Sequence, residues 1–368
     1  MPDLTSDADA GRRGDVIDLD DPEALRAGDA TATLLHASMA GAQVRAVATA
    51  VEAGALEQIE GTRPRALVWV SGRSARARQA AAVVTATAAH VGGPSVPPVV
   101  VVHELPAWAG ALDVVLVSGD DAGDPALERA IAAAARRGAG VVVDVPREGP
   151  VAEAGADRAA WLEPLPYLPP HRGVLRHVAA GMAVLTALGV PGLDVAAAAD
   201  AVDLELEGIG PELATPVNPA KLLATTVAGT DRLVWVHDDP VAEAFCARAV
   251  AAFRDAGRVT AAATIPDAVR GQAERAAGRP AVDPLARLFH DEELDGTWDD
   301  RSVRHLGMVL GADEDFVRPA AGPLTDLEWV SDRGRDTVGD VPAPFSGRVA
   351  ALMARTEIAA AYLLVGGL

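Results

Sequence analysis

The segment Leu67-Val68-Trp69-Val70-Ser71-Gly72-Arg73-Ser74 decides the fold, because a short apolar run ends there in a polar turn and a helical stretch over residues 75–89 follows. This order is typical of a strand that feeds a helix in a parallel α/β sheet. The pattern returns in the second half of the chain, where Leu233-Val234-Trp235-Val236 precedes a polar turn and a helical stretch over residues 240–256. A duplicated unit predicts two α/β domains in tandem. We expect the functional site where strand ends meet helix starts, in the cleft between the domains.

Further apolar runs predict the other strands of each sheet. They lie at residues 65–70, 98–102, 113–117, 140–145 and 157–162 in the first half, and at 233–236, 258–264, 304–310 and 326–330 in the second. Helical stretches alternate with them, so the predicted class is α/β, with two mostly parallel, doubly wound, flavodoxin-like sheets flanked by helices. The expected divisions are a flexible arm (1–20), a first domain (21–170), connecting helices (171–228) and a second domain closed by a long apolar helix (229–368).

The composition and the net charge indicate which kinds of binding partner and which cellular location to expect. The chain has 368 residues, of which 50% are hydrophobic, and this is enough to build two cores. Its formal net charge is −20 and it has no basic run, which argues against nucleic-acid binding. No 18-residue apolar run is free of charges and the N-terminus is acidic, so we expect a cytoplasmic protein without a membrane span. Cys246 is alone, which excludes an internal disulfide and any cysteine-based metal site.

The turns after the strands carry the polar residues that could do chemistry. Ser71-Gly72-Arg73-Ser74 precedes a helix, and its hydroxyls and N–H groups would either cap that helix or bind a phosphate. The turn Ser118-Gly119-Asp120-Asp121-Ala122-Gly123-Asp124 and the turn His237-Asp238-Asp239 are acidic. Carboxylates at these positions favour helix capping over phosphate binding, and a metal site is the less favoured alternative.

Two further positions are candidates on residue type alone. Lys221 is the only lysine of the chain, in a predicted first helical turn after a Gly- and Pro-rich loop. It is either a solvated charge or a substrate-binding residue. His290 stands beside Asp291 and Glu292, which would keep its imidazole protonated for acid–base work; the alternative is a polar helix end.

The order of these motifs resembles the sugar isomerase (SIS) domain family. The resemblance rests on the duplicated strand, Ser/Gly turn and helix, on the connector Pro169-Pro170-His171-Arg172, and on the late His290-Asp291-Glu292. The chain is most similar to the bifunctional phosphoglucose/phosphomannose isomerases, which carry two such domains, and more narrowly to their divergent actinobacterial TobH-like branch. The resemblance covers most of residues 25–368.

The resemblance implies roles for individual residues. The family's phosphate-binding turn falls on Ser71, Gly72, Arg73 and Ser74, with Ser118 in the second turn, although most hydroxyls of that second turn are replaced by aspartates. The arginine that stabilises the enediolate matches Arg172, with His171 as its rival, and the catalytic histidine matches His290.

The general base has two candidates, Asp267 and Glu274. The catalytic lysine that the family has near its C-terminus has no counterpart in this chain.

Two functions follow from the resemblance. The first is a phosphosugar-binding protein that interconverts aldose and ketose phosphates, with glucose 6-phosphate or mannose 6-phosphate as substrate. The second is a catalytically degenerate relative that binds the sugar phosphate as a sensor or partners another protein, the extreme case being a scaffold with a vestigial cleft. We expect a homodimer, a small-molecule sugar phosphate as ligand, and no cofactor or metal.

Overall fold

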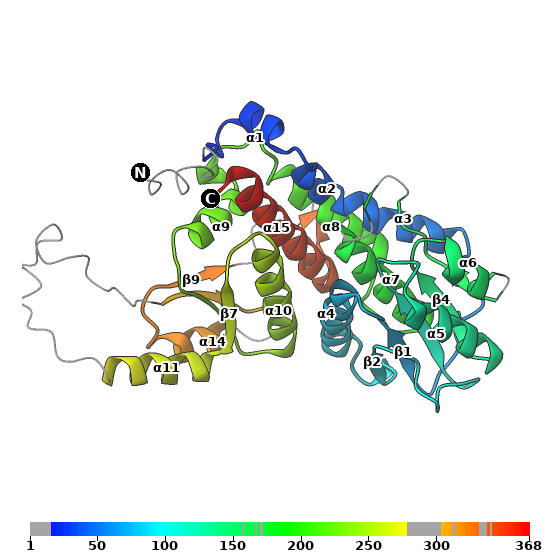
Figure 1. The fold of residues 1–368 in the computed structure, drawn as a ribbon. Coiled ribbons are helices and arrows are strands. Elements are labelled where there is room, and N and C mark those ends of the chain that lie inside the picture. Colours follow the sequence, from blue (N-terminus) through cyan, green and yellow to red (C-terminus); the bar gives the residue numbers. More distant parts are fainter. Residues whose placement is uncertain are drawn as a thin grey trace, which may run out of the picture.

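The structure is a computed structural model that describes residues 16–156, 158–165, 168–169, 172–277, 303–311, 314–330, 337–338 and 341–368. Within these residues the chain forms two parallel sheets flanked by helices, as Figure 1 shows. The predicted α/β class and doubly wound architecture are confirmed.

The first sheet has the order β2-β1-β3-β4-β5 within the described residues, and all of its pairings are parallel. Its strands are β1 (Leu67–Val70), β2 (Val99–Val102), β3 (Val114–Ser118), β4 (Gly140–Asp144) and β5 (Ala160–Trp161). Valine dominates β2, β3 and β4, and β-branched side chains suit strands that are covered on both faces. The strands lie where the sequence predicts them, with ends displaced by a few residues.

The second sheet has the order β7-β6-β8-β9 in the part of the chain that is described, again with parallel pairings. Its strands are β6 (Leu233–His237), β7 (Thr260–Thr264), β8 (Arg304–Met308) and β9 (Leu327–Val330), and a two-stranded hairpin of β10 (Thr337–Val338) and β11 (Val341–Pro342) lies outside the sheet. In both sheets the Leu-Val-Trp-Val strand occupies the second position. The duplicated sequence pattern therefore has a duplicated place in the topology.

Helices cover both faces of the first sheet. On one face lie α5 (Pro125–Arg136) and α6 (Gly149–Gly155), and on the other lie α3 (Ala40–Glu52), α4 (Ala75–Gly92) and α7 (Val174–Ala187). The remaining helices are α1 (Pro22–Gly28), α2 (Thr33–Ser38), α8 (Val195–Glu207), α9 (Pro219–Ala228), α10 (Pro240–Asp255), α11 (Ile265–Ala277), α14 (Glu314–Ala321) and α15 (Phe345–Gly366). Short 3₁₀ turns, η1 (Gly93–Ser95) and η3 (Thr215–Val217), complete the connections.

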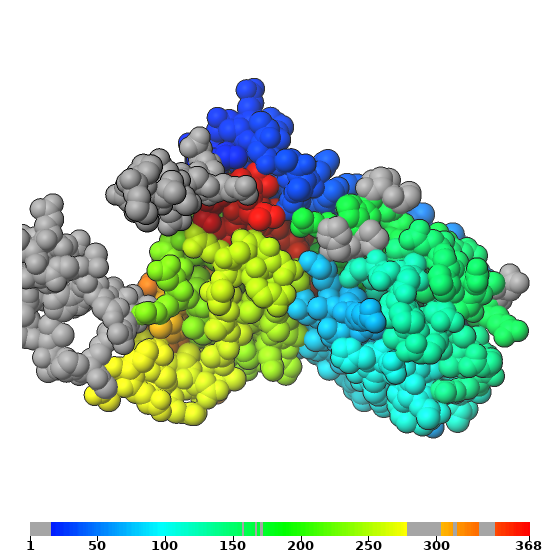
Figure 2. Space-filling model, viewed as in Figure 1, coloured from blue at the N-terminus to red at the C-terminus, as the bar shows by residue number. Residues whose placement is uncertain are grey.

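The two halves share one apolar core. A single cluster of buried side chains contains Trp69 of β1, Trp235 of β6 and Tyr362 of α15. Helix α4 of the first half packs on α10 of the second, and Figure 2 shows this contact on its face of the molecule. Helix α15, red in Figure 1, contacts α8, α9, α10 and α2. It is long and apolar enough to cross a membrane, but most of it is buried against these helices, as a core helix is.

A close backbone approach fixes α7 on the first sheet. Trp69 is fully buried, and a Cβ atom on Gly181 would lie 2.1 Å from its Cη2 atom. Only glycine leaves room for the indole at this point of the helix. The contact sets the position of α7, whose first turns carry charged residues to the end of the sheet.

Candidate functional site

Three polar side chains meet at one edge of the first sheet, where its parallel strands end. Ser71 follows β1, Ser118 ends β3 and Asp144 ends β4, and all three are buried. The carboxyl ends of parallel strands lie at the same edge, which is why residues far apart in sequence come together here. Ser71 Oγ donates to the carbonyl of Val102 at 3.3 Å, whereas Ser118 Oγ has no hydrogen-bond partner among the described residues.

A buried polar chain joins these strand ends to α7 and α4. Asp144 Oδ2 lies 2.6 Å from His177 Nδ1, and His177 Nε2 lies 3.1 Å from Asp120 Oδ1. Ser74 Oγ donates to Asp120 Oδ2 at 2.6 Å. Arg176 Nη1 lies 2.8 Å from Asp144 Oδ1 as an ion pair, since its angles are not those of a hydrogen bond. The network thus holds two carboxylates, one guanidinium and one imidazole.

The network favours the protonated form of His177. Both of its ring nitrogens face carboxylate oxygens, to which an imidazolium can donate two hydrogen bonds. Burial alone would lower the pKa of His177, but the nearby Asp144 and Asp120 carboxylates outweigh burial and raise it above its usual 6.5. Burial would raise the pKa of Asp120, but His177 and Ser74 lower it to about 2.

The β1–α4 turn is occupied by carboxylates of the chain itself. Asp124 Oδ2 accepts a hydrogen bond from the Arg73 N–H at 2.9 Å, while Asp120 takes the Ser74 hydroxyl. Gly72 has φ +49, and a Cβ atom there would lie 2.4 Å from Asp124 Oδ2. Glycine is therefore required both for the left-handed backbone and for the approach of the carboxylate.

The capping interpretations of the turns are confirmed. Ser74 Oγ accepts from the Ala77 N–H and caps α4, and Asp124 caps α5. In the second half, Asp239 Oδ1 accepts from two N–H groups of the first turn of α10, and its Oδ2 accepts from the Leu310 N–H at 3.2 Å. Phosphate binding by the turn from Ser71 to Ser74 stays a prediction.

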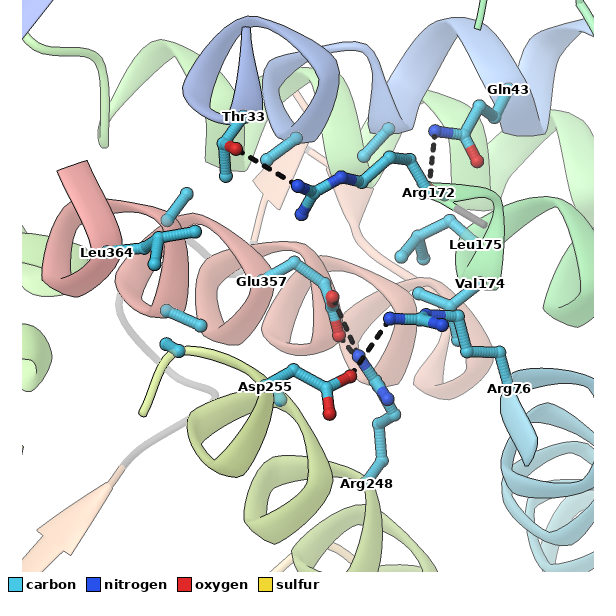
Figure 3. Close-up of a pocket in the computed structure, with 16 residues that line it drawn as sticks. Thr33, Gln43, Arg76, Arg172, Val174, Leu175, Arg248, Asp255, Glu357 and Leu364 are labelled. Carbon is cyan, nitrogen blue, oxygen red and sulfur yellow. Dashed lines mark hydrogen bonds and ion pairs between the residues drawn. The ribbon is translucent and has the colours of Figure 1, made fainter. Parts of the chain in front are cut away.

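A pocket opens between the two halves (Figure 3). It has a cavity volume of about 50 Å³ and opens to solvent, and it lies between α2, α3 and the start of α7 on one side and α10 and α15 on the other. Three arginines line it, namely Arg76, Arg172 and Arg248, together with the carboxylates of Asp255 and Glu357. Its charged lining therefore carries one more cation than anion.

Two of the three arginines have carboxylate partners, and both make a contact across the boundary between the halves. Arg248 binds both carboxylate oxygens of Glu357, at 2.8 and 2.9 Å, and donates to Gln79 Oε1 at 2.7 Å. Arg76 Nη2, from α4, donates to Asp255 Oδ2 of α10 at 2.9 Å. These contacts hold α4, α10 and α15 together around the pocket.

Arg172 differs from the other two arginines. Its Nη2 donates to Thr33 Oγ1 at 3.0 Å, and among the described residues no carboxylate lies within ion-pair distance of it. Its backbone carbonyl accepts from Gln43 Nε2 at 3.3 Å. The Gln43 side chain lines the pocket and is buried, yet its Oε1 has no partner within the described parts of the chain. The pocket thus presents one cation and one acceptor that the described residues leave unsatisfied.

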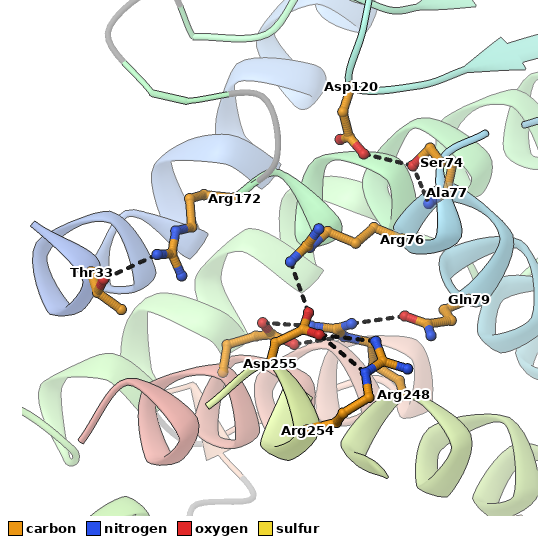
Figure 4. Close-up of polar contacts among 11 residues, drawn as sticks. Thr33, Ser74, Arg76, Ala77, Gln79, Asp120, Arg172, Arg248, Arg254 and Asp255 are labelled. Atoms are coloured by element: carbon orange, nitrogen blue, oxygen red, sulfur yellow. Dashed lines mark hydrogen bonds and ion pairs between the residues drawn. The ribbon is translucent and has the colours of Figure 1, made fainter. Parts of the chain in front are cut away.

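The polar network and the pocket lie next to each other, as Figure 4 shows. Ser74 caps α4 and Arg76 lies in its first turn, and the view places Asp120 and Ser74 on one side of Arg76 and Asp255 on the other. Burial would lower the pKa of Arg248, but Glu357 raises it, with a smaller contribution from Asp120. The two groups of charges therefore share one electrostatic environment.

Lys221 is not the solvated charge that the sequence allowed, and its role as a substrate-binding residue stays a prediction. It is fully buried, and its Nζ donates to the carbonyls of Pro211 and Leu213 at 2.9 and 2.7 Å. Asp20 Oδ1 lies 3.6 Å away, and the amine stands over the Tyr362 ring. The lysine holds a loop in place and is not among the residues that line the pocket.

The two candidate bases are also away from the pocket. Asp267 and Glu274 are exposed on α11, at the outer end of the second half in Figure 1, and Asp267 pairs with Arg270 at 3.0 Å. Neither carboxylate lines the pocket, and the identity of the general base stays a prediction. His290 and His171 lie outside the described residues, and the role of His290 stays a prediction.

Sequence reasoning missed Asp144, Arg176, His177, Arg76 and Arg248. A signal for the first three exists, because Arg176 and His177 are the only charged or titratable residues in an otherwise apolar helix, and Asp144 ends a run of valines. Polar residues in such places need partners. Nothing comparable distinguishes Arg76 and Arg248 from the many other arginines.

Comparisons with known proteins support the fold. No protein-family model matches the chain, and no curated protein matches it. Among solved structures, tagatose-6-phosphate ketose/aldose isomerase from Escherichia coli is similar, with a TM-score of 0.53, 12% identity and coverage of 91% of this chain and 92% of that one. The C-terminal domain of glucosamine-fructose-6-phosphate aminotransferase from Francisella tularensis is similar with a TM-score of 0.54, 8% identity and coverage of 91% and 96%. The fold is that of the SIS phosphosugar isomerases.

Proposed function

We propose that the pocket between the two halves binds a sugar phosphate. The observation that carries the proposal is Arg172, a guanidinium in this pocket without a carboxylate partner among the described residues. An anionic group of the ligand would complete its hydrogen bonds, because guanidinium binds phosphate through paired N–H donors. Gln43 Oε1 supports the same ligand class, since a sugar hydroxyl would supply the donor that this buried acceptor lacks.

The reaction we propose is aldose–ketose isomerisation of glucose 6-phosphate or mannose 6-phosphate. The likeness in fold to a tagatose-6-phosphate ketose/aldose isomerase supports it. Such a reaction moves a proton between C1 and C2 and needs a cation beside the enediolate oxygen. Arg172 is the candidate cation in the pocket, and His290 is proposed as the residue that opens the sugar ring.

The second candidate function is binding without turnover. The filled β1–α4 turn favours it, because the Arg73 N–H and the Ser74 hydroxyl already have carboxylate partners. The position of Lys221 outside the pocket favours it too. The chain would then act as a sugar-phosphate sensor or as a partner of another protein.

Calorimetric titration with mannose 6-phosphate and glucose 6-phosphate tests binding. We expect Arg172→Gln to weaken it by at least about tenfold, the value of one charge-assisted hydrogen bond. Arg129→Gln is the matched control, because Arg129 is exposed on α5 and pairs only with exposed Glu104 among the described residues. Equal affinities of the wild type and Arg172→Gln, or no binding at millimolar ligand, would refute the proposal.

A coupled assay for fructose 6-phosphate separates the two candidates. Turnover that disappears in Arg172→Gln and His290→Ala supports the isomerase, and binding without turnover supports the sensor.

We also propose that the protein is a cytoplasmic homodimer. Each chain would have a first domain that ends near residue 170 and a second domain that begins near residue 229. Light scattering of the purified protein tests its mass.

A further inference from the structure

The β1–α4 turn contains a negatively charged group that is part of the chain. Asp124 is 3% exposed, and its Oδ2 accepts the Arg73 N–H while its Oδ1 accepts the Ala126 N–H at 2.9 Å. It comes from the β3–α5 turn, so one carboxylate caps its own helix and also reaches into the neighbouring turn. The missing side chain of Gly72 gives it the space to do so.

A second carboxylate is held beside the first. Asp120 accepts the Ser74 hydroxyl at 2.6 Å, and His177 holds its other oxygen. His177 is itself fixed by Asp144, which pairs with Arg176. Buried partners therefore hold the Asp120 carboxylate in place.

We propose that Asp124 and Asp120 are specificity-determining residues that keep phosphate out of the β1–α4 turn. Their oxygens accept the Arg73 N–H and the Ser74 hydroxyl, two donors that a phosphate at this helix start would otherwise use. Two fixed negative charges would also repel an incoming dianion in a partly buried site. A phosphate group would then bind elsewhere, and Arg172, which has no carboxylate partner among the described residues, is the cation in the pocket that can take it.

The consequence for orientation rests on the proposed function. A sugar phosphate in the pocket would direct its phosphate toward Arg172, and would leave neutral hydroxyl groups for the end that faces Asp120. The exclusion of phosphate from the turn does not depend on that proposal, and the two can be tested apart.

The test uses the full chain, inorganic phosphate and two substitutions that keep a helix cap. Asp124→Ser and Asp124→Gly both remove the carboxylate from the turn, and serine and glycine are accepted at N-cap positions. Asp194→Ser is the matched control, because Asp194 caps α8 in the same way but fills no strand-end turn. Phosphate affinity is measured by calorimetry, and the place of binding by the amide resonance of Arg73.

In the wild type we expect phosphate to leave the Arg73 amide resonance unchanged and to bind in a manner that depends on Arg172. In Asp124→Ser we expect that resonance to shift, and the affinity to rise by at least about tenfold and to persist when Arg172→Gln is added. Asp194→Ser should behave as the wild type. A gain in Asp124→Ser with no Arg172 dependence in the wild type would support the exclusion and refute the proposed function.

Two results would overturn the inference. The first is a shift of the Arg73 amide in the wild type on adding phosphate, because the turn would then accept the anion despite Asp124. The second is no shift and no gain of affinity in either Asp124 variant, with cooperative thermal unfolding showing that both are folded. In that case the carboxylate is a cap alone.

Discussion

The turns that follow β1 and β6 start from the same strand sequence and end with different chemistry. In the second half, Asp239 of the turn itself caps α10 and holds the Leu310 N–H. In the first half, the carboxylates come from another turn, and one of them continues into the buried network of His177 and Asp144. The Leu-Val-Trp-Val pattern thus repeats the topology and not the site.

The surroundings of the two tryptophans show the same contrast. Trp235 stacks on Phe253 at 5.9 Å and meets Phe245 at 6.3 Å, an apolar environment that serves stability. Trp69 packs on the bare backbone of Gly181, which brings the charged first turns of α7 to the sheet. In the first half, the contact of the central tryptophan therefore positions polar groups. We expect substitutions there to change stability differently from substitutions in the second half.

The largest difference is expected for the carboxylates themselves. Asp144→Ala leaves Arg176 buried without its anion, removes one of the two carboxylates that His177 faces, and should cost about 3–5 kcal/mol of unfolding free energy. The counterpart Asp239→Ala loses a cap and a backbone partner and should cost about 2 kcal/mol. Urea unfolding at neutral pH measures both. Equal losses would show that the charged network is no more demanding than a helix cap.

Next in size is the effect of filling the space at the glycines that face tryptophans. Gly181→Ala pushes a methyl group into fully buried Trp69 and should cost about 3 kcal/mol. In Gly307→Ala the new atom would lie 2.5 Å from Trp329, which is only half-buried and so less tightly confined than Trp69, and we expect a loss of about 1 kcal/mol. Thermal unfolding compares them. A larger loss at Gly307 would reverse our view of which half is tightly packed.

Acid should weaken the first half through Asp120. Its pKa is about 2 in the folded chain against 3.8 as the ordinary value, so its stabilisation is present above pH 4 and lost as the pH falls toward 2. The shift corresponds to roughly 2 kcal/mol. Urea unfolding from pH 5 to pH 2 should show this slope, and Asp120→Asn should flatten it. An unchanged slope in the variant would assign the acid sensitivity to other carboxylates.

His177 contributes in the opposite sense. Because its pKa is raised in the folded chain, its stabilisation is complete below pH 6.5 and is lost as the pH rises through that higher value.

The smallest effect that we expect is the change in ligand affinity when Lys221 is substituted. Lys221→Met leaves the carbonyls of Pro211 and Leu213 without their donor and should cost about 1–3 kcal/mol of stability. Affinity for mannose 6-phosphate should change by less than about twofold, since the lysine does not line the pocket. A loss of affinity comparable with that of Arg172→Gln would restore the lysine as a binding residue.

The candidate site was predictable only in part from the sequence. Arg172 was named only because the resemblance to the sugar isomerase family assigns an arginine to this connector, and it does line the pocket. Ser71, Ser74 and Ser118 were placed correctly at strand ends, because an apolar run followed by a polar turn fixes where a strand stops. The sequence showed that the turn after β3 is acidic and that its aspartates could cap a helix. It did not show that Asp124 and Asp120 also bind Arg73 and Ser74, because these two residues lie in a different turn.

The sequence by itself determined the two parallel sheets and their helices, because apolar runs, polar turns and helical periodicity act locally and depend on neighbours along the chain. Only the tertiary structure decided which charges meet. It paired Arg248 with Glu357 and Arg76 with Asp255, left Arg172 without a carboxylate among the described residues, and buried Lys221. The physical reason is that a charge is satisfied by whatever lies within a few ångströms, and packing between distant helices sets that distance.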